Sequence, residues 1–284
     1  MPKTANHEDS TSVERYYARR ESRWGYKYLL RGTKHYGYYP KNSSLSMLQA
    51  QKVMESKLGN ELNLPKGSKI LDAGCGEGLV AIHLAAEFGH VIHGVDILDW
   101  SIEEAIKNKQ KSLLGGLTFE VGDYSDLRAP DNSFDAIYTM ETLVHSPDFN
   151  KTLREFYRVL KPGGVLVNHE YVLDDNLPPK DAAAWKVMFS ECPMLDAFHN
   201  FRVSKMNDHW ERAGFINISA SDITHRVEPF MKRLYQIAFI PYYTLKLFGK
   251  ESNYVNTFAG VKSYQLRNQF HYTIMKSYKP NSHR

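Results

Sequence analysis

The sequence predicts an α/β fold in which a mainly parallel sheet is covered by helices on both faces. The first observation behind this prediction is the stretch Ile70–Gly78, which reads ILDAGCGEG and runs from an apolar strand through three glycines into a helical pattern. Glycine allows a tight turn and a close ligand approach, and the start of a helix offers free N–H groups at the same place. The second observation is that short apolar strands alternate with helical patterns from Lys69 to Val172, as they do in parallel sheets. The stretch Ile70–Gly78 is therefore expected to hold a nucleotide-type cofactor.

The residues before this stretch are expected to form a tail and a lid. Met1–Ser12 is polar and is expected to be a disordered tail. Residues 13–60 are expected to form an N-terminal helical lid, with helices at Val13–Leu30 and Ser44–Leu58. The loop His35–Pro40 between them has four aromatic or imidazole side chains around a glycine, and it either packs on the domain or closes over the ligand site.

Residues 61–284 are expected to form the cofactor-binding domain. Its strands share short apolar runs and are expected at Lys69–Ala73, Val91–Ile97, Leu117–Val121, Asp135–Met140, Val165–Val172, Phe215–Ala220 and Gln269–Tyr278. The helices between them are expected at Leu79–Phe88, Ser101–Lys111, Phe149–Leu160 and Ser204–Ala213. Right-handed crossovers bring the carboxyl ends of parallel strands to one edge of a sheet, where ligands bind. Two insertions, residues 174–203 and 223–268, interrupt the alternation and are expected to form an aromatic cap over that edge.

The composition excludes several classes of protein. The net charge is +4 with both signs mixed along the chain, so no nucleic-acid partner is expected, because such partners need a clustered basic face. Cys75 and Cys192 lie far apart and suggest neither a disulfide framework nor a zinc site, which favours a reducing compartment and a cytoplasmic location. No metal is expected. The aromatic share of 13% fits either an aromatic-rich core or an aromatic pocket for an apolar ligand.

The glycine spacing bears on the identity of the cofactor. Dinucleotide-binding folds usually carry Gly-x-Gly-x-x-Gly, whereas this chain has Gly74-x-Gly76-x-Gly78, which disfavours a nicotinamide cofactor. Asp96 ends the second strand, where a carboxylate can accept hydrogen bonds from both hydroxyls of a ribose. Asp123 ends the third strand, where a carboxylate can meet an adenine amino group.

Together with the turn Leu160–Gly164, these residues resemble the class I S-adenosylmethionine-dependent methyltransferases. The resemblance implies a Rossmann-like seven-stranded methyltransferase core, mostly parallel with an antiparallel last strand. It implies S-adenosyl-L-methionine as cofactor and S-adenosyl-L-homocysteine as product, with the glycine turn around the amino-acid end of the cofactor. The implied cofactor contacts are Asp72, Gly74, Cys75, Gly76, Gly78, Asp96, Ile97, Asp123, Tyr124 and Met140.

The segment Tyr138–Pro147 narrows the resemblance, because an acidic residue and then a histidine follow the fourth strand. It is similar to sterol 24-C-methyltransferases, with isoprenoid C-methyltransferases as relatives. The implied reaction is C-methylation of an isoprenoid, terpenoid or sterol-like alkene through a carbocation, which aromatic faces stabilise and a base deprotonates. The candidates for that base are Glu141, His145 and Glu170. The candidate substrate contacts are Trp24, Tyr36, Tyr38, Tyr39 and Phe198.

Several alternatives stay open at this point. The chain could be an N- or O-methyltransferase of a small metabolite, or a non-catalytic module that binds S-adenosylmethionine and acts by interaction. The apolar stretch Leu234–Phe248 is too short to span a membrane, so it either caps the pocket or makes a peripheral contact with a membrane. Assembly into a homo-oligomer is also left open.

Overall fold

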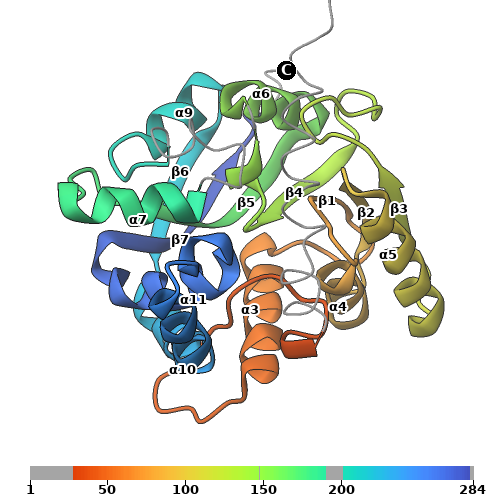
Figure 1. Cartoon of the computed structure of the whole chain (residues 1–284). Coiled ribbons are helices and arrows are strands. Elements are labelled where there is room, and N and C mark those ends of the chain that lie inside the picture. Colours follow the sequence, from red (N-terminus) through yellow and green to blue (C-terminus); the bar gives the residue numbers. More distant parts are fainter. Residues whose placement is uncertain (1–27, 147, 190–200, 282–284) are drawn as a thin grey trace, which may run out of the picture.

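The computed structural model describes residues 28–146, 148–189 and 201–281, which form one seven-stranded sheet with helices around it (Figure 1). The strand order is β3-β2-β1-β4-β5-β7-β6. The strands are β1 (Lys69–Ala73), β2 (Val91–Asp96), β3 (Leu117–Val121), β4 (Phe134–Met140), β5 (Leu160–Leu173), β6 (Ile216–Asp222) and β7 (Phe270–Tyr278). Strands β1 to β5 pair in parallel, and β7 is antiparallel to both of its neighbours, β5 and β6. The predicted seven-stranded fold with an antiparallel last strand is confirmed.

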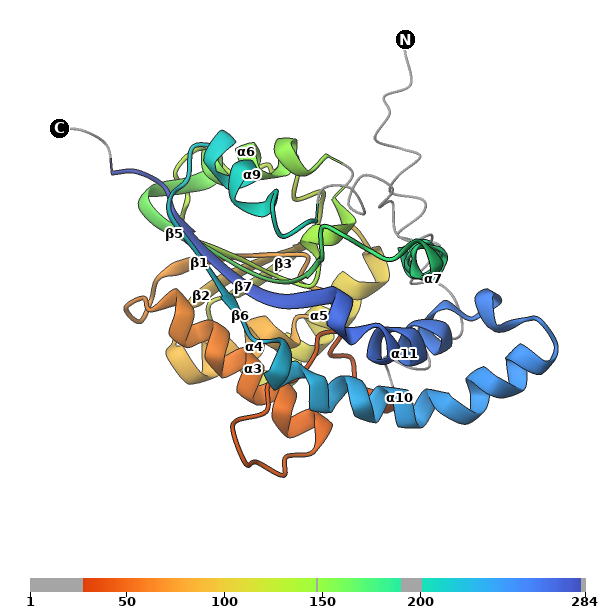
Figure 2. The same cartoon turned by 90° about the vertical axis from the view of Figure 1, so that its left-hand side faces the viewer.

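Helices cover both faces of this sheet (Figure 2). One face carries α3 (Met47–Leu62), α4 (Leu79–Phe88) and α5 (Asp99–Ser112), and the other carries α6 (Phe149–Val159) and α9 (Met206–Arg212). Beyond one end of the strands lie α7 (Pro179–Phe189), α10 (Thr224–Leu247) and α11 (Val255–Gln265). Three 3-10 turns complete the ordered elements of the described residues at Leu143–His145 (η2), Glu251–Asn253 (η3) and Arg267–Gln269 (η4).

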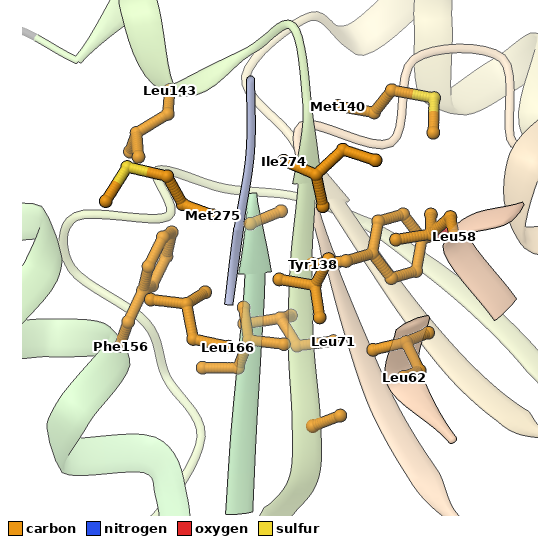
Figure 3. Close-up of a cluster of buried hydrophobic side chains, with 14 of the residues drawn as sticks. Leu58, Leu62, Leu71, Tyr138, Met140, Leu143, Phe156, Leu166, Ile274 and Met275 are labelled. Carbon is orange, nitrogen blue, oxygen red and sulfur yellow. The ribbon is translucent and has the colours of Figure 1, made fainter. Parts of the chain in front are cut away.

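The hydrophobic core lies on both sides of the central strands (Figure 3). Leu58 and Leu62 of α3 face Tyr138 of β4, and Phe156 of α6 lies on the other side of the sheet. All four side chains are at most 2% exposed. Burial of a leucine of this size contributes about 1.5–3 kcal/mol. Helix α3, expected as part of the lid, thus also forms part of the layer that covers the sheet.

The N-terminal ends of two helices follow from the sequence around them. Helix α3 starts at Met47 because Ser46 and Gln49 form a capping box, in which each side chain accepts a hydrogen bond from the other residue's N–H. Helix α4 starts after Gly78, which has φ = +72°. A Cβ atom at Gly78 would lie 2.7 Å from the Phe119 ring, so glycine here permits close packing of the helix turn on β3.

The fifth strand begins earlier than expected, at Leu160 and not at Val165. The N–H of Ser133 donates to the carbonyl of Val159 at 2.8 Å, and Leu160 pairs with Phe134. Because of this pairing, Leu160–Gly164, which was expected to form a turn, belongs to strand β5.

The N-terminal segment runs across the molecule as an extended strap, which we define as residues 32–40. Backbone bonds tie it to two helices: the N–H of Tyr38 donates to Ala50 of α3 and that of Tyr39 to Arg226 of α10, each at 2.9 Å. The Gln51 side chain donates to the carbonyl of His35 at 2.8 Å. The strap therefore lies along both helices and over the carboxyl ends of the strands.

Candidate functional site

A cavity opens at the carboxyl ends of β1, β2, β3 and β4, under the strap. The turn after β1 forms one wall, the ends of β2 and β3 a second, and the segment after β4 a third. Every cofactor contact implied by the sequence lines this cavity except Gly78, whose place is in the packing of α4 on β3. Those lining residues are Asp72, Gly74, Cys75, Gly76, Asp96, Ile97, Asp123, Tyr124 and Met140.

The backbone of the glycine turn has a shape that favours glycine. Gly74 and Gly76 have φ of +85° and +52°, in the left-handed region. A Cβ at Gly74 would lie 2.5 Å from Oγ1 of Thr142, which donates to the carbonyl of Ala73 at 2.7 Å. A Cβ at Gly76 would point into open space, with the Lys34 amine 3.8 Å away as its nearest described neighbour. The turn thus leaves open space beside Gly76, as a cradle for the amino-acid end of S-adenosylmethionine would require.

Asp96 is fixed relative to that cradle. Its Oδ2 accepts a hydrogen bond from the N–H of Gly76 at 2.8 Å, and its Oδ1 accepts one from the N–H of Leu98 at 3.0 Å. A carboxylate has about four lone-pair sites, so it can accept ribose hydroxyls as well. Asp123, at the neighbouring strand end, accepts from the N–H of Ser125 at 2.7 Å, and the Tyr124 hydroxyl donates to the carbonyl of Thr142 at 2.9 Å.

Asp72 lies in the floor of the cavity and is 3% exposed. Burial raises the pKa of Asp72 to about 7, opposed by the nearby hydroxyl of Tyr138. Its Oδ2 has no hydrogen-bond partner among the described residues. A buried carboxyl of this kind is ionised most readily beside a cation, and the sulfonium and ammonium groups of S-adenosylmethionine are cations. The donor set and the charge of the cavity therefore fit this cofactor.

Two further residues of the cavity have shifted pKa values. Burial raises the pKa of the Cys75 thiol well above its usual value, so Cys75 lines the wall as a neutral side chain. Lys34, which was not expected from the sequence, lies in the strap with its amine 4.8 Å from the Trp100 ring centre. Burial lowers the pKa of Lys34, opposed by Asp96 and Glu77. Lys34 directly precedes the aromatic loop His35–Pro40 in the sequence, and no motif marks it.

Glu141 follows β4 and lines the cavity. It has φ = +56°, an uncommon value for a residue other than glycine, and its N–H donates to the carbonyl of His169 at 2.8 Å. Its Oε1 accepts two hydrogen bonds of 2.7 Å, from the N–H of Tyr36 and from the hydroxyl of Tyr272. Burial raises the pKa of Glu141, with His35 as the largest opposing influence.

The other two base candidates have different environments. His145 lines the cavity, and burial lowers its pKa to about 4, with Lys34 acting in the same direction. Glu170 is fully buried and does not line the cavity. Its side chain accepts hydrogen bonds from the N–H groups of Val144 and Tyr171, each at 3.2 Å, so it braces the turn that carries His145.

The strap places its aromatic rings away from the cavity. Tyr36 packs edge-on against Phe230 and Tyr272, with ring centres 5.7 and 5.9 Å apart, and the Tyr39 hydroxyl accepts from Arg233 at 2.9 Å. Neither these rings nor that of Tyr38 line the cavity, whereas Gly32–His35 do. The backbone bonds of Tyr38 and Tyr39 to α3 and α10 set this orientation. The remaining substrate candidates, Trp24 and Phe198, lie outside the described residues.

Within the described parts of the chain, no group of three or more His, Cys, Asp or Glu side chains is arranged to hold a metal ion. None of the described helices is both long enough and apolar enough to cross a membrane.

Comparisons with known proteins place this geometry in a family. Residues 64–225 match the family described as "Methyltransferase domain". The S-adenosyl-L-methionine-dependent Diels-Alderase iccD of Talaromyces variabilis is 32% identical over 281 residues, which cover 95% of either chain. The sterol 24-C-methyltransferase erg6 of Aspergillus fumigatus is 37% identical over 122 residues, or 43% of this chain and 32% of that protein.

Among solved structures, the geranyl diphosphate C-methyltransferase from Streptomyces coelicolor, in complex with Mg2+, geranyl diphosphate and S-adenosyl-L-homocysteine, has the same fold. The two structures superpose with a TM-score of 0.74 at 17% sequence identity, and the alignment covers 98% of this chain and all of that one. The match to the methyltransferase domain spans more than half of the chain and takes in the glycine turn, Asp96, Asp123 and Glu141. The chain therefore belongs to the S-adenosylmethionine-dependent methyltransferases, and S-adenosylmethionine is its cofactor.

Proposed function

We propose that the chain transfers the methyl group of S-adenosylmethionine to a carbon atom of an apolar alkene of the isoprenoid or sterol-like class. The observation that carries this proposal is the position of Glu141. A buried carboxyl stands in the wall of the cofactor cavity, and two donors hold one of its oxygens. No donor among the described residues binds its second oxygen, so this oxygen can accept a proton in the wall of the cofactor cavity.

The reaction needs little from the protein beyond orientation and one base. The bound cofactor supplies an electrophilic methyl group. The π electrons of the acceptor form the new carbon–carbon bond while the bond between sulfur and the methyl carbon breaks, which leaves a carbocation on the acceptor. Loss of a proton from a neighbouring carbon to Glu141 restores the alkene.

The surroundings of Glu141 suit this role. Because burial raises its pKa, its carboxylate accepts a proton more readily than an exposed one does. Tyr124 and Tyr138 are among the residues that line the cavity, and an aromatic face that reaches the acceptor would stabilise a cation there by about 0.5–2 kcal/mol. His145, with its pKa near 4, is neutral at physiological pH and does not repel the sulfonium.

A second candidate function is supported by the extent of one match. The relative iccD matches 95% of this chain, whereas the 122 residues shared with erg6 are too few to include both the sheet and the α7–α11 segment. The same cavity could then promote a Diels–Alder cyclisation of an apolar polyene. That reaction forms two carbon–carbon bonds, loses no atom and leaves the cofactor intact.

Product analysis separates these functions. The full chain is incubated with S-adenosylmethionine carrying a deuterated methyl group and with a panel of prenyl diphosphates, sterols, polyenes, amines and phenols. We expect a product with one labelled methyl group on carbon, together with S-adenosylhomocysteine. Labelled products on nitrogen or oxygen alone would refute C-methylation. A product isomeric with its substrate, without turnover of the cofactor, would establish the cyclisation instead.

A further inference from the structure

Helices α10 and α11 form a hairpin that extends away from the sheet (Figure 2). Its inner side is closed by Tyr242 of α10 and by Phe258 and Val261 of α11, all buried. The turn η3 lies between the two helices at the far end of the hairpin. The hairpin therefore shares a small core with Ala184, Val187 and Met188 of α7, and the exposed side chains at the far end of α10 are not part of that core.

The far end of α10 exposes large apolar side chains. Ile240, Leu247 and Phe248 are 75%, 84% and 71% exposed, and Tyr243 is 38% exposed. Ile240, Tyr243 and Leu247 are spaced three and four residues apart, which puts them on one face of the helix. We call these three residues and Phe248 the outer tip. Contiguous apolar exposure of this kind marks an interaction site.

The hairpin around the outer tip is basic. Residues 224–265 contain six basic side chains and two acidic ones. Lys246 and Lys250 are exposed beside the outer tip. Of the two acidic residues, Glu228 is paired with Arg267 at 2.8 Å, and one carboxyl oxygen of Glu251 is buried. The outer tip thus combines exposed apolar groups with two exposed lysines, Lys246 and Lys250, against one nearby carboxyl group, that of Glu251.

We propose that the outer tip docks on a lipid surface that carries anionic headgroups. A helix with apolar residues on one face and lysines at its border lies in the interface of a bilayer, with its apolar face among the acyl chains. Each lysine near an anionic surface adds to the affinity for it. A second copy of the chain fits less well, because two basic hairpins would repel each other.

Helix α10 is also connected to the cavity by contacts with the strap. Near the start of α10, Phe230 packs on Tyr36, and the N–H of Tyr36 donates to Glu141. A lipid surface is where apolar acceptors gather, so docking would bring the cavity close to them. The docking itself rests on the outer tip alone and holds whichever reaction the cavity performs.

Co-sedimentation of the full chain with vesicles tests the proposal. We expect binding to vesicles of phosphatidylcholine mixed with phosphatidylglycerol, weaker binding as salt is raised, and much weaker binding to phosphatidylcholine alone. The double variant Leu247→Glu, Phe248→Glu should lose at least about tenfold in affinity for the mixed vesicles. The matched control is Leu113→Glu, because Leu113 is 91% exposed and lies outside the hairpin; this variant should bind like the unchanged chain. Binding of S-adenosylmethionine confirms that each variant is folded.

Three results would overturn the inference. The first is absence of binding to the mixed vesicles. The second is equal binding by the double variant and the Leu113→Glu control. The third is a dimer that the double variant dissociates, without any vesicle binding, because the outer tip would then be an interface between copies of the chain.

Discussion

The affinity for S-adenosylmethionine should depend on pH through Asp72. Burial raises the pKa of this carboxyl from its usual 3.8 to about 7 in the protein without ligand. A cationic cofactor favours the ionised form, so below about pH 7 binding must first remove a proton. At about pH 6 this costs about 1.4 kcal/mol, a factor of about ten in affinity, and above about pH 8 the cost vanishes. Binding should therefore become about tenfold tighter between these two pH values.

Isothermal titration calorimetry measures this effect directly. In two buffers of different ionisation enthalpy, the apparent binding enthalpies at about pH 6 should differ by an amount that reports the release of nearly one proton. Asp72→Asn should flatten the pH profile, whereas Asp208→Asn, a change at an exposed position of α9, should leave it unchanged. A dissociation constant that is independent of pH over this range in the unchanged chain would refute the reasoning.

The same shift has a consequence for folding. Because the pKa of Asp72 is higher in the folded than in the unfolded chain, the folded state keeps its proton longer as the pH rises. The contribution of Asp72 to the free energy of unfolding is then largest below about pH 4 and is lost between about pH 4 and 7. Thermal unfolding of Asp72→Asn without ligand should lack this part of the pH dependence.

Three substitutions test other parts of the site. Asp96→Ala should weaken S-adenosylmethionine binding by about 1.5–3 kcal/mol in calorimetry, because the carboxylate also holds Gly76 of the cradle at 2.8 Å; an unchanged affinity would remove Asp96 from the site. Glu141→Gln should keep the cofactor affinity but lower methyl transfer about 10²–10⁴-fold in a product assay, and a wild-type rate would exclude Glu141 as the base. Lys34→Met should weaken binding of S-adenosylmethionine about tenfold or more while sparing 5′-methylthioadenosine, which lacks the amino-acid end. If both ligands are weakened equally, Lys34 does not contact that end.

The cofactor side of the site follows closely from sequence, for a physical reason. Residues that end neighbouring parallel strands must meet at one edge of the sheet, so Asp96 and Asp123 could be placed beside the glycine turn from their positions in the chain. Each of them lines the cavity. The glycine turn is likewise local, since its shape depends on the positive φ of Gly74 and Gly76.

The positions of the residues expected to contact the methyl acceptor depend on contacts between distant segments, which a sequence pattern does not show. The rings of Tyr38 and Tyr39 point away from the cavity because the strap pairs with α3 and α10. Glu170 lies in the fifth strand as expected. Its side chain, however, accepts hydrogen bonds from the N–H groups of Val144 and Tyr171 and so supports the turn that carries His145.

The order of the strands along the chain also determines when the two parts of the candidate site can form during synthesis of the protein. Among the described strands, β6 pairs with β7 alone, and β7 contributes the Tyr272 hydroxyl that donates to Glu141. Because β7 follows the other described strands in sequence, a ribosome-bound chain that has not yet reached it has an unpaired β6 and a Glu141 without one of its two donors. The cradle after β1 needs none of these residues, so a growing chain can assemble the cofactor half of the site well before the half that holds the base.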